Sequence, residues 1–161
     1  MTFERGILGG VTIVSFLLIL VIPREKYRLA AVAFLVIQFI TTILGHVVVE
    51  FDALAYPVRE FSRVNRTSFI YEFLAFPMMC AIFNVYYPAH RSRLLQIGNY
   101  MLYCTVITII EVFIERYTNL ILYLKWNWFW TWGSVLITLL ITRVICVVFF
   151  RTVHQENENS R

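Results

Sequence analysis

The chain has 161 residues, of which 60% are hydrophobic, 17% are aromatic and only 15% are charged. Soluble proteins are about 45–50% apolar and about 25% charged, and a soluble domain of this length could not bury so much apolar surface. The composition therefore excludes an ordinary soluble domain and predicts a protein of the lipid bilayer. The net charge of +4 is modest and lies in short connections, which argues against a nucleic-acid-binding protein.

Five apolar segments are long enough to cross a bilayer, since a spanning helix needs about 20 mostly apolar residues. The first ends at Pro23 without a small-x-small cleavage site, so we expect a retained span and not a signal peptide. Pro77 is expected to kink the third span. We predict an all-α bundle of five transmembrane helices in a single domain, residues 1–153, followed by a polar tail, residues 154–161. The predicted spans are residues 6–22, 29–49, 68–87, 94–117 and 128–150.

The longest connection, residues 50–67, combines a basic pattern with an apolar one. Arg59, Arg63 and Arg66 recur at i, i+4 and i+7, while apolar side chains fall on a different side. This spacing predicts a short amphipathic helix lying in the membrane interface between spans 2 and 3, with its arginines toward the lipid headgroups. An ordinary basic loop is the alternative interpretation.

The orientation of the chain stays open. Five spans would place the two termini on opposite sides of the membrane. More positive charge follows the first span than precedes it, which slightly favours an amino terminus on the outside. The arginines of the long connection oppose this assignment, because they would prefer the anionic cytoplasmic leaflet.

Antiparallel packing would bring several polar side chains to one level near one face of the membrane. The second and fourth spans end where the third and fifth begin, and a rise of about 1.5 Å per residue places these side chains within roughly 10 Å of one another in depth. Polar side chains inside a membrane must face protein partners or water, so we predict an acidic pocket open toward the long connection. Its residues are His46, Glu50, Glu72, Glu111, Glu115 and Arg116.

All four tryptophans lie in a short stretch at the start of the fifth span. Tryptophan is favoured where water meets lipid, because its ring is apolar and its N–H still needs a partner. On a helix, Trp126 and Trp130 would share one face, and Trp128 and Trp132 the other. Rings on both sides fit an anchoring aromatic belt better than a convergent ligand cage, so we expect a belt.

Recognisable catalytic and metal-binding spacings are missing from the sequence. It has no Gly-x-Ser-x-Gly, no His-Glu-x-x-His and no Ser-His-Asp order. Cys80, Cys104 and Cys146 are isolated, so neither a zinc site nor a redox motif is indicated. We therefore expect no catalytic residue, no metal and no cofactor.

Three roles for the polar layer remain open. The carboxylates could form a structural ion-pair network with cations such as Arg59, Arg116 and Lys125, or support proton or cation transport, because relays of this kind use carboxylates and histidine. The third role, binding of a partner, a lipid or a small ligand, is our leading hypothesis. We expect a non-enzymatic protein whose partners are the lipid bilayer and either another membrane protein or a second copy of this chain.

Four short segments also carry a family resemblance. They are residues 56–61 (YPVREF), 83–88 (FNVYYP), 115–121 (ERYTNLI) and 125–132 (KWNWFWTW). Together they resemble a family of small, largely uncharacterised multi-span membrane proteins of endospore-forming bacteria, and the likeness covers residues 22–151. The resemblance implies a location in the bacterial cytoplasmic membrane or the spore inner membrane, and it adds no catalytic residue.

Overall fold

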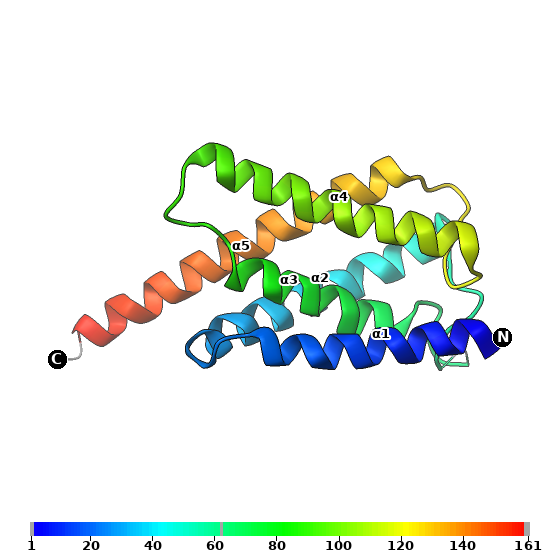
Figure 1. Ribbon diagram of the computed structural model, residues 1–161, viewed down its shortest axis with the longest axis horizontal. Helices are drawn as coiled ribbons and strands as arrows, with labels where there is room; N and C mark the ends of the chain where they lie inside the picture. Colours follow the sequence, from blue (N-terminus) through cyan, green and yellow to red (C-terminus); the bar gives the residue numbers. More distant parts are fainter. Residues whose placement is uncertain (1, 62, 160–161) are drawn as a thin grey trace.

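The computed structural model describes residues 2–61 and 63–159, with the side chains of residues 3–61 and 63–152. The described chain is dominated by helices, as predicted (Figure 1). The α-helices are α1 (Thr2–Val21), α2 (Tyr27–Glu50), α3 (Phe76–Val85), α4 (Arg93–Tyr117) and α5 (Trp128–Asn159). The shorter elements are the 3-10 turn η1 (Arg24–Lys26), the π-helical segment η2 (Tyr71–Ala75) and the strands β1 (Leu54–Ala55) and β2 (Leu122–Tyr123).

Four helical stretches are long and apolar enough to cross a membrane, which indicates a membrane-embedded protein. Many of their large apolar side chains point outward, as expected where lipid and not water is the solvent. The fifth apolar helix, Tyr71–Val85, is shorter than the other four, so the count of five spans stays a prediction. The four long stretches are Phe3–Val21, Arg24–Glu50, Arg93–Tyr117 and Trp128–Thr152.

The short third helix differs from a regular span in a way that Pro77 explains. Proline has no N–H to donate, and its ring clashes with the carbonyl four residues earlier, which here belongs to Phe73. The backbone widens into η2 at that position, just before α3 begins. The helix ends at Val85, three residues before Pro88, because the backbone preceding a proline avoids the helical conformation.

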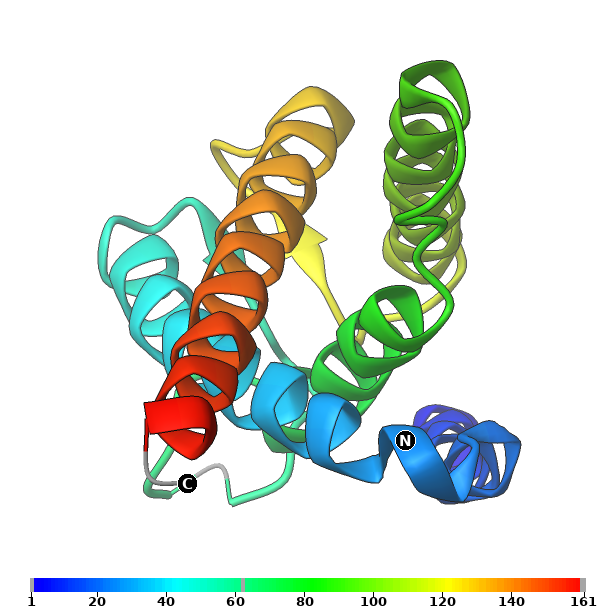
Figure 2. The ribbon, with the colours of Figure 1, turned by 90° about the vertical axis from the view of Figure 1, so that its left-hand side faces the viewer.

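α3 occupies the inside of the bundle. It packs against α1, α2 and α5, and in the end-on view it lies between α1, α2 and α4 (Figure 2). Most of its side chains are buried, as in a helix that is apolar on all sides. The largest buried cluster joins α3 to α2, α4 and α5 through residues such as Phe83, Ile37, Tyr100 and Leu139.

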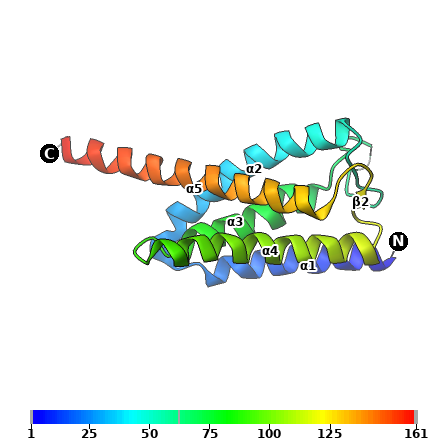
Figure 3. The same cartoon turned by 90° about the horizontal axis from the view of Figure 1, so that it is seen from above.

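α5 is the longest helix and crosses α2 (Figure 3). Its carboxyl-terminal part projects beyond the other helices (Figures 1 and 3). The helical backbone continues to Asn159, so residues 154–159, which we predicted as part of a separate polar tail, extend the same helix. Residues 160 and 161 of that tail lie outside the described part of the chain.

Two connections are tied together at one end of the bundle. β1 pairs with β2 in antiparallel fashion, with Leu54 opposite Tyr123. Main-chain N–H groups of Leu124 and Lys125 also donate to the carbonyl of Ala53, at 3.0 and 3.1 Å. The α2–η2 connection is therefore held against the α4–α5 connection.

The predicted interfacial helix carrying Arg59, Arg63 and Arg66 is wrong. Across residues 51–61 and 63–68 the described backbone forms turns and β1. The Arg59 side chain donates from Nη1 to the carbonyl of Tyr56 (2.7 Å) and from Nε to that of Asn65 (2.8 Å), which folds the connection back on itself. These bonds join residues three and six positions apart along a path that is not helical, so helical spacing in the sequence could not reveal them.

Candidate ligand-binding site

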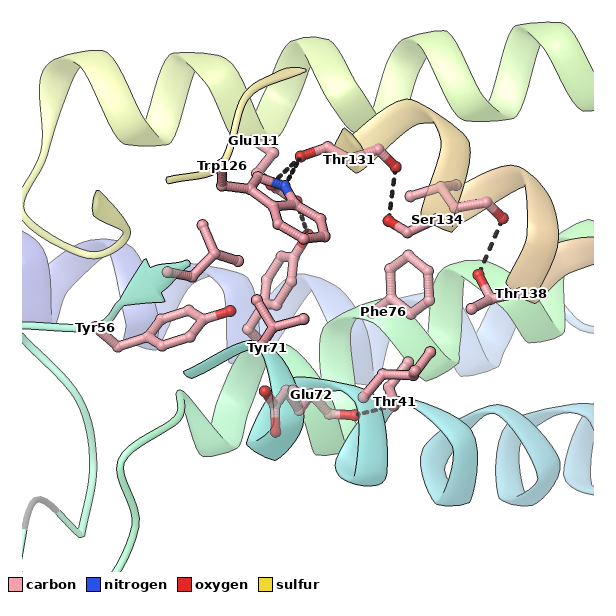
Figure 4. Close-up of a pocket in the computed structure, with 15 residues that line it drawn as sticks. Thr41, Tyr56, Tyr71, Glu72, Phe76, Glu111, Trp126, Thr131, Ser134 and Thr138 are labelled. Carbon is pink, nitrogen blue, oxygen red and sulfur yellow. Dashed lines mark hydrogen bonds between the residues drawn. The ribbon is translucent and has the colours of Figure 1, made fainter. Parts of the chain in front are cut away.

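A cavity of about 170 Å³ lies between α2 and α5, at the end of the bundle where β1 and β2 pair (Figure 4). Its wall is mostly apolar and draws on α2, α3, α4, α5, η2 and the two paired connections. Two carboxylates face it from different sides: Glu111 of α4 and Glu72 of η2. Four aromatic residues line the same space, namely Tyr56, Tyr71, Phe76 and Trp126.

Glu111 is held by hydroxyl groups. Tyr71 donates to its Oε2 at 2.6 Å, while Tyr123 and Thr131 donate to its Oε1 at 2.8 and 2.7 Å. Trp126 extends this network, because its Nε1 donates to Thr131 Oγ1 at 2.8 Å. The donors come from η2, β2 and the start of α5, so the network joins η2 to the distant segment that contains β2 and the start of α5. Neutral donors alone therefore satisfy both oxygens of this buried carboxylate.

Glu72 is satisfied on one side only. Thr67 Oγ1 donates to its Oε2 at 2.8 Å, while Oε1 is buried without a hydrogen-bond partner. The residue is only 4% exposed, and a buried acceptor without a donor is costly. The carboxylate lies against Gly45 of α2, where a Cβ would collide with Oε1. Glycine at that position lets α2 approach the carboxylate closely.

The predicted polar layer divides into separate groups. Glu72 and Glu111 line one cavity, whereas His46 and Glu50 are exposed on α2 and lie in a different groove. Glu50 Oε2 forms a salt bridge with Arg66 Nη1 at 3.2 Å, and both side chains are mostly exposed. His46 and Glu50 thus face the outside of the bundle.

Glu115 and Arg116 stand at the end of α4 and do not line the cavity. Glu115 is half-buried, and Arg116 is exposed because it points about 100° away around the helix. Within residues 3–61 and 63–152, no lysine or arginine lies within salt-bridge distance of Glu72 or Glu111. These two carboxylates are therefore not part of an ion-pair network there.

The tryptophans do not form one helical set, because α5 begins only at Trp128. Asn127 caps the helix, its Oδ1 accepting from the N–H groups of Phe129 (3.0 Å) and Trp130 (3.2 Å). Trp126 precedes this cap, and its half-buried ring turns into the cavity. The sequence interpretation treated Trp126 as helical and so missed its place in the cavity wall.

The other three tryptophans have different surroundings. Trp128 and Trp130 are 60% and 57% exposed, as an anchoring belt requires, and the belt stays a prediction for these two. Trp132 instead packs against the central buried cluster, and its Nε1 donates to Thr105 Oγ1 at 3.3 Å. Contacts with the buried cluster and with Thr105 of α4 thus fix the orientation of this ring.

Sequence reasoning also missed the hydroxyl donors of the site. Tyr71 and Glu72 are adjacent in sequence, yet they point to different sides of their helix, one toward Glu111 and the other toward α2. Tyr123 reaches Glu111 only because β2 pairs with β1. The sequence offered one signal for these donors: Tyr71 directly precedes Glu72 in an apolar segment.

Two of the tyrosines lie outside the membrane-crossing helices. Burial raises the pKa of Tyr56 well above its usual value, and nearby Glu72 adds to the effect. Burial likewise raises the pKa of Tyr123, with Glu111 as the next cause. Both phenols are consequently neutral at ordinary pH, and Tyr123 remains a hydrogen-bond donor to Glu111.

The described residues contain no group of three or more His, Cys, Asp or Glu side chains placed to hold a metal ion. The chain matches no protein-family model, no curated protein and no solved structure. The chemistry of the cavity is therefore the basis on which a function can be inferred.

Proposed function

We propose that this membrane-embedded protein binds a small ligand in the cavity between α2 and α5 and acts without catalysing a reaction. The observation that carries the proposal is the convergence of both buried carboxylates, Glu72 and Glu111, on one mostly apolar cavity. A cavity of about 150 Å³ can hold benzene, so this one suits a ligand of about six to ten non-hydrogen atoms.

The state of Glu72 supports a binding role over a purely structural one. A structural carboxylate in an apolar region is expected to have all its acceptor sites filled, because unpaired buried charge is strongly destabilising. Glu72 Oε1 lacks a partner among the described residues. A ligand that donated a hydrogen bond to this oxygen would remove the cost of burying it unpaired. Ligand binding would then stabilise the protein.

The arrangement of the polar groups supports a non-enzymatic role. Ser134 donates its hydroxyl to the carbonyl of Thr131 at 2.9 Å, and Glu111 accepts from three hydroxyls. Neither residue is placed as the nucleophile or the base of a reacting pair.

Thermal unfolding of the purified protein with a set of small amphiphiles tests the proposal. We expect ligands of the stated size to raise the unfolding temperature of the wild type and to have little effect on Ser134→Leu, whose larger side chain fills the cavity. Ile137→Leu, at an exposed position on the same helix, is the matched control and should respond like the wild type. Equal responses in wild type and Ser134→Leu would contradict the proposal.

Carboxylate-dependent proton or cation transport is the second candidate. The observation that favours it is the same pair of buried carboxylates, which have no arginine or lysine partner within the described part of the chain. Measurement of pH-driven ion flux in proteoliposomes tests it. Transport predicts flux in the wild type that Glu111→Gln abolishes, whereas absence of flux in the wild type rejects it.

The membrane that holds the protein, its partner and its topology are further proposals. The resemblance to membrane proteins of endospore-forming bacteria suggests a bacterial cytoplasmic or spore inner membrane, with another membrane protein or a second copy of the chain as partner. Five crossing segments would place the termini on opposite sides, and four would place them on the same side. Tags at both termini, probed from each side of the membrane, distinguish these topologies.

A further inference from the structure

We propose that the ligand of this cavity is a small ammonium compound whose cationic head binds at Glu72 among the aromatic rings. The inference rests on the proposed binding function and adds the chemical class of the ligand. It follows from which acceptors are already occupied, from what the aromatic residues present to the cavity and from the size of the space.

The first step concerns the two carboxylates. Glu111 accepts three hydroxyl donors, so the protein itself satisfies both of its oxygens. Glu72 receives one donor, from Thr67, and its Oε1 receives none. A donor is therefore missing at Glu72 and not at Glu111. Because Oε1 is packed against Gly45, the side chain has to turn toward the cavity to receive a donor from a ligand. An N⁺–H donor forms a charge-assisted bond with a carboxylate, which is roughly twice as strong as a bond between neutral groups.

The second step concerns the other polar groups of the wall. Thr41 Oγ1 donates to the carbonyl of Ile37 at 2.9 Å, and Thr138 Oγ1 donates to that of Val135 at the same distance. These hydroxyls, like that of Ser134, donate to the main chain and offer a ligand only neutral acceptor oxygens. A cationic donor binds more strongly to a carboxylate than to a neutral oxygen, so Glu72 is the preferred acceptor for a cationic ligand.

The third step concerns the aromatic residues. The hydroxyl of Tyr71 bonds Glu111, and the indole N–H of Trp126 bonds Thr131, so the polar atoms of both rings are already engaged. Together with Phe76, whose ring centroid lies 6.3 Å from that of Tyr71, they contribute aromatic surface to the cavity wall (Figure 4). Aromatic faces attract cations, and most strongly so where water is excluded.

The fourth step concerns size and polarity. The remaining wall includes Leu44, Val48 and Val135, which favour an apolar ligand body. A volume of about 170 Å³ has room for one ring or a short chain beside the cationic head. The ammonium could belong to a free amine or to the headgroup of an ethanolamine phospholipid, since both present the same group.

The experiment compares benzylammonium with benzyl alcohol, which has the same ring and a neutral head. Binding to the purified protein in detergent is followed by calorimetry and by tryptophan fluorescence. We expect the wild type to bind benzylammonium at least about tenfold more tightly than benzyl alcohol. Glu72→Gln should weaken benzylammonium binding by about 10- to 100-fold. It should change benzyl alcohol binding by no more than about threefold, because the amide oxygen of glutamine still accepts from a hydroxyl. Glu50→Gln removes an exposed carboxylate of α2 and should change neither affinity.

The outcomes separate the inference from the proposed function. Equal binding of the two probes by the wild type, unaffected by Glu72→Gln, would overturn the ammonium inference and leave a cavity for neutral ligands. Failure of both probes and of the wider amphiphile set to bind would overturn the function as well. Should Glu72→Gln fail to fold, the comparison of the two probes on the wild type decides alone.

A lipid arm identifies the source of the ammonium. The protein is placed in nanodiscs of phosphatidylglycerol alone or mixed with phosphatidylethanolamine. Competition by phosphatidylethanolamine against benzylammonium supports a headgroup ligand, and unchanged affinity supports a free amine. Tighter benzylammonium binding in the presence of phosphatidylethanolamine would contradict competition for a shared ammonium site.

Discussion

Gly45 of α2 lies directly against the carboxylate of Glu72, so closely that no side chain fits at position 45 without displacing it. The glycine is therefore a spatial requirement of the buried acid. The contact also shows that α2 and η2 pack closely at the cavity, so a substitution on one element is expected to displace the other.

The first prediction follows from this contact. Gly45→Ala should destabilise the protein by about 1–3 kcal/mol, because the new methyl group overlaps the carboxylate. This loss should outweigh the gain of up to about 1 kcal/mol that alanine brings to a helix. Denaturant unfolding in detergent measures both effects.

Two comparisons make the test specific. A Cβ added at Gly98 of α4 would have open space around it, so Gly98→Ala should be neutral or stabilising. In a Glu72→Ala background, where the carboxylate is gone, Gly45→Ala should lose most of its cost. An equal cost of Gly45→Ala with and without the Glu72 side chain would refute the contact as its cause.

The hydroxyl network around Glu111 leads to the second prediction. Thr131→Val keeps the shape of the side chain, but it removes a donor to Glu111 and the acceptor of the Trp126 N–H. We expect a loss of about 1–3 kcal/mol in the free energy of unfolding, because buried polar groups are left unpaired. Thr152→Val, at an exposed position late in α5, should change it by less than about 0.5 kcal/mol. Similar losses in the two variants would argue against the network.

The third prediction concerns alkaline pH. Burial raises the pKa of Tyr123 above the value of 10.0 that applies to the unfolded chain. The folded state thus holds its proton more tightly, and this contribution to stability is complete below pH 10 and is lost as the pH rises through the folded pKa. Unfolding measured from pH 8 upward should show stability falling above pH 10. The fall should be smaller in Tyr123→Phe, even if that variant is less stable at pH 8, and unchanged in Tyr117→Phe, whose ring is 73% exposed.

Arg59 provides the fourth prediction. Its bonds to the carbonyls of Tyr56 and Asn65 hold the α2–η2 connection in its folded-back path. Arg59→Met should raise the rate of chymotrypsin cleavage within residues 56–69 several-fold, since local opening exposes the backbone. Arg63→Met, at an exposed position of the same connection, should leave the rate unchanged. Equal rates for the two variants would show that the Arg59 bonds do not hold the connection.

The long helices were predictable from the sequence. Apolar runs of spanning length are a strong signal, and the predicted segment 94–117 differs from α4 by one residue. The helix around Pro77 was less predictable in its length, because the two prolines that shape its course act on local backbone geometry. The membrane character of the chain was thus predictable from composition and from the length of its apolar runs.

The site was only partly predictable. Depth along antiparallel helices brought Glu72 and Glu111 to one level, but depth does not say which way a side chain points. His46 and Glu115 shared that level without lining the cavity. Tyr123 is positioned for Glu111 by strand pairing between distant connections, and no periodic pattern in the sequence encodes that pairing.

The pairing of β1 with β2 has a consequence for the integrity of the cavity wall. Leu54 of β1 forms part of the wall, and the hydroxyl of Tyr123 of β2 donates to Glu111, so separation of the strands would displace a wall residue and remove a donor from the carboxylate at the same time. The shape of the wall and the hydrogen bonding of Glu111 therefore depend on the same few main-chain bonds. Loss of those bonds would disturb the site even if every residue that lines it were kept.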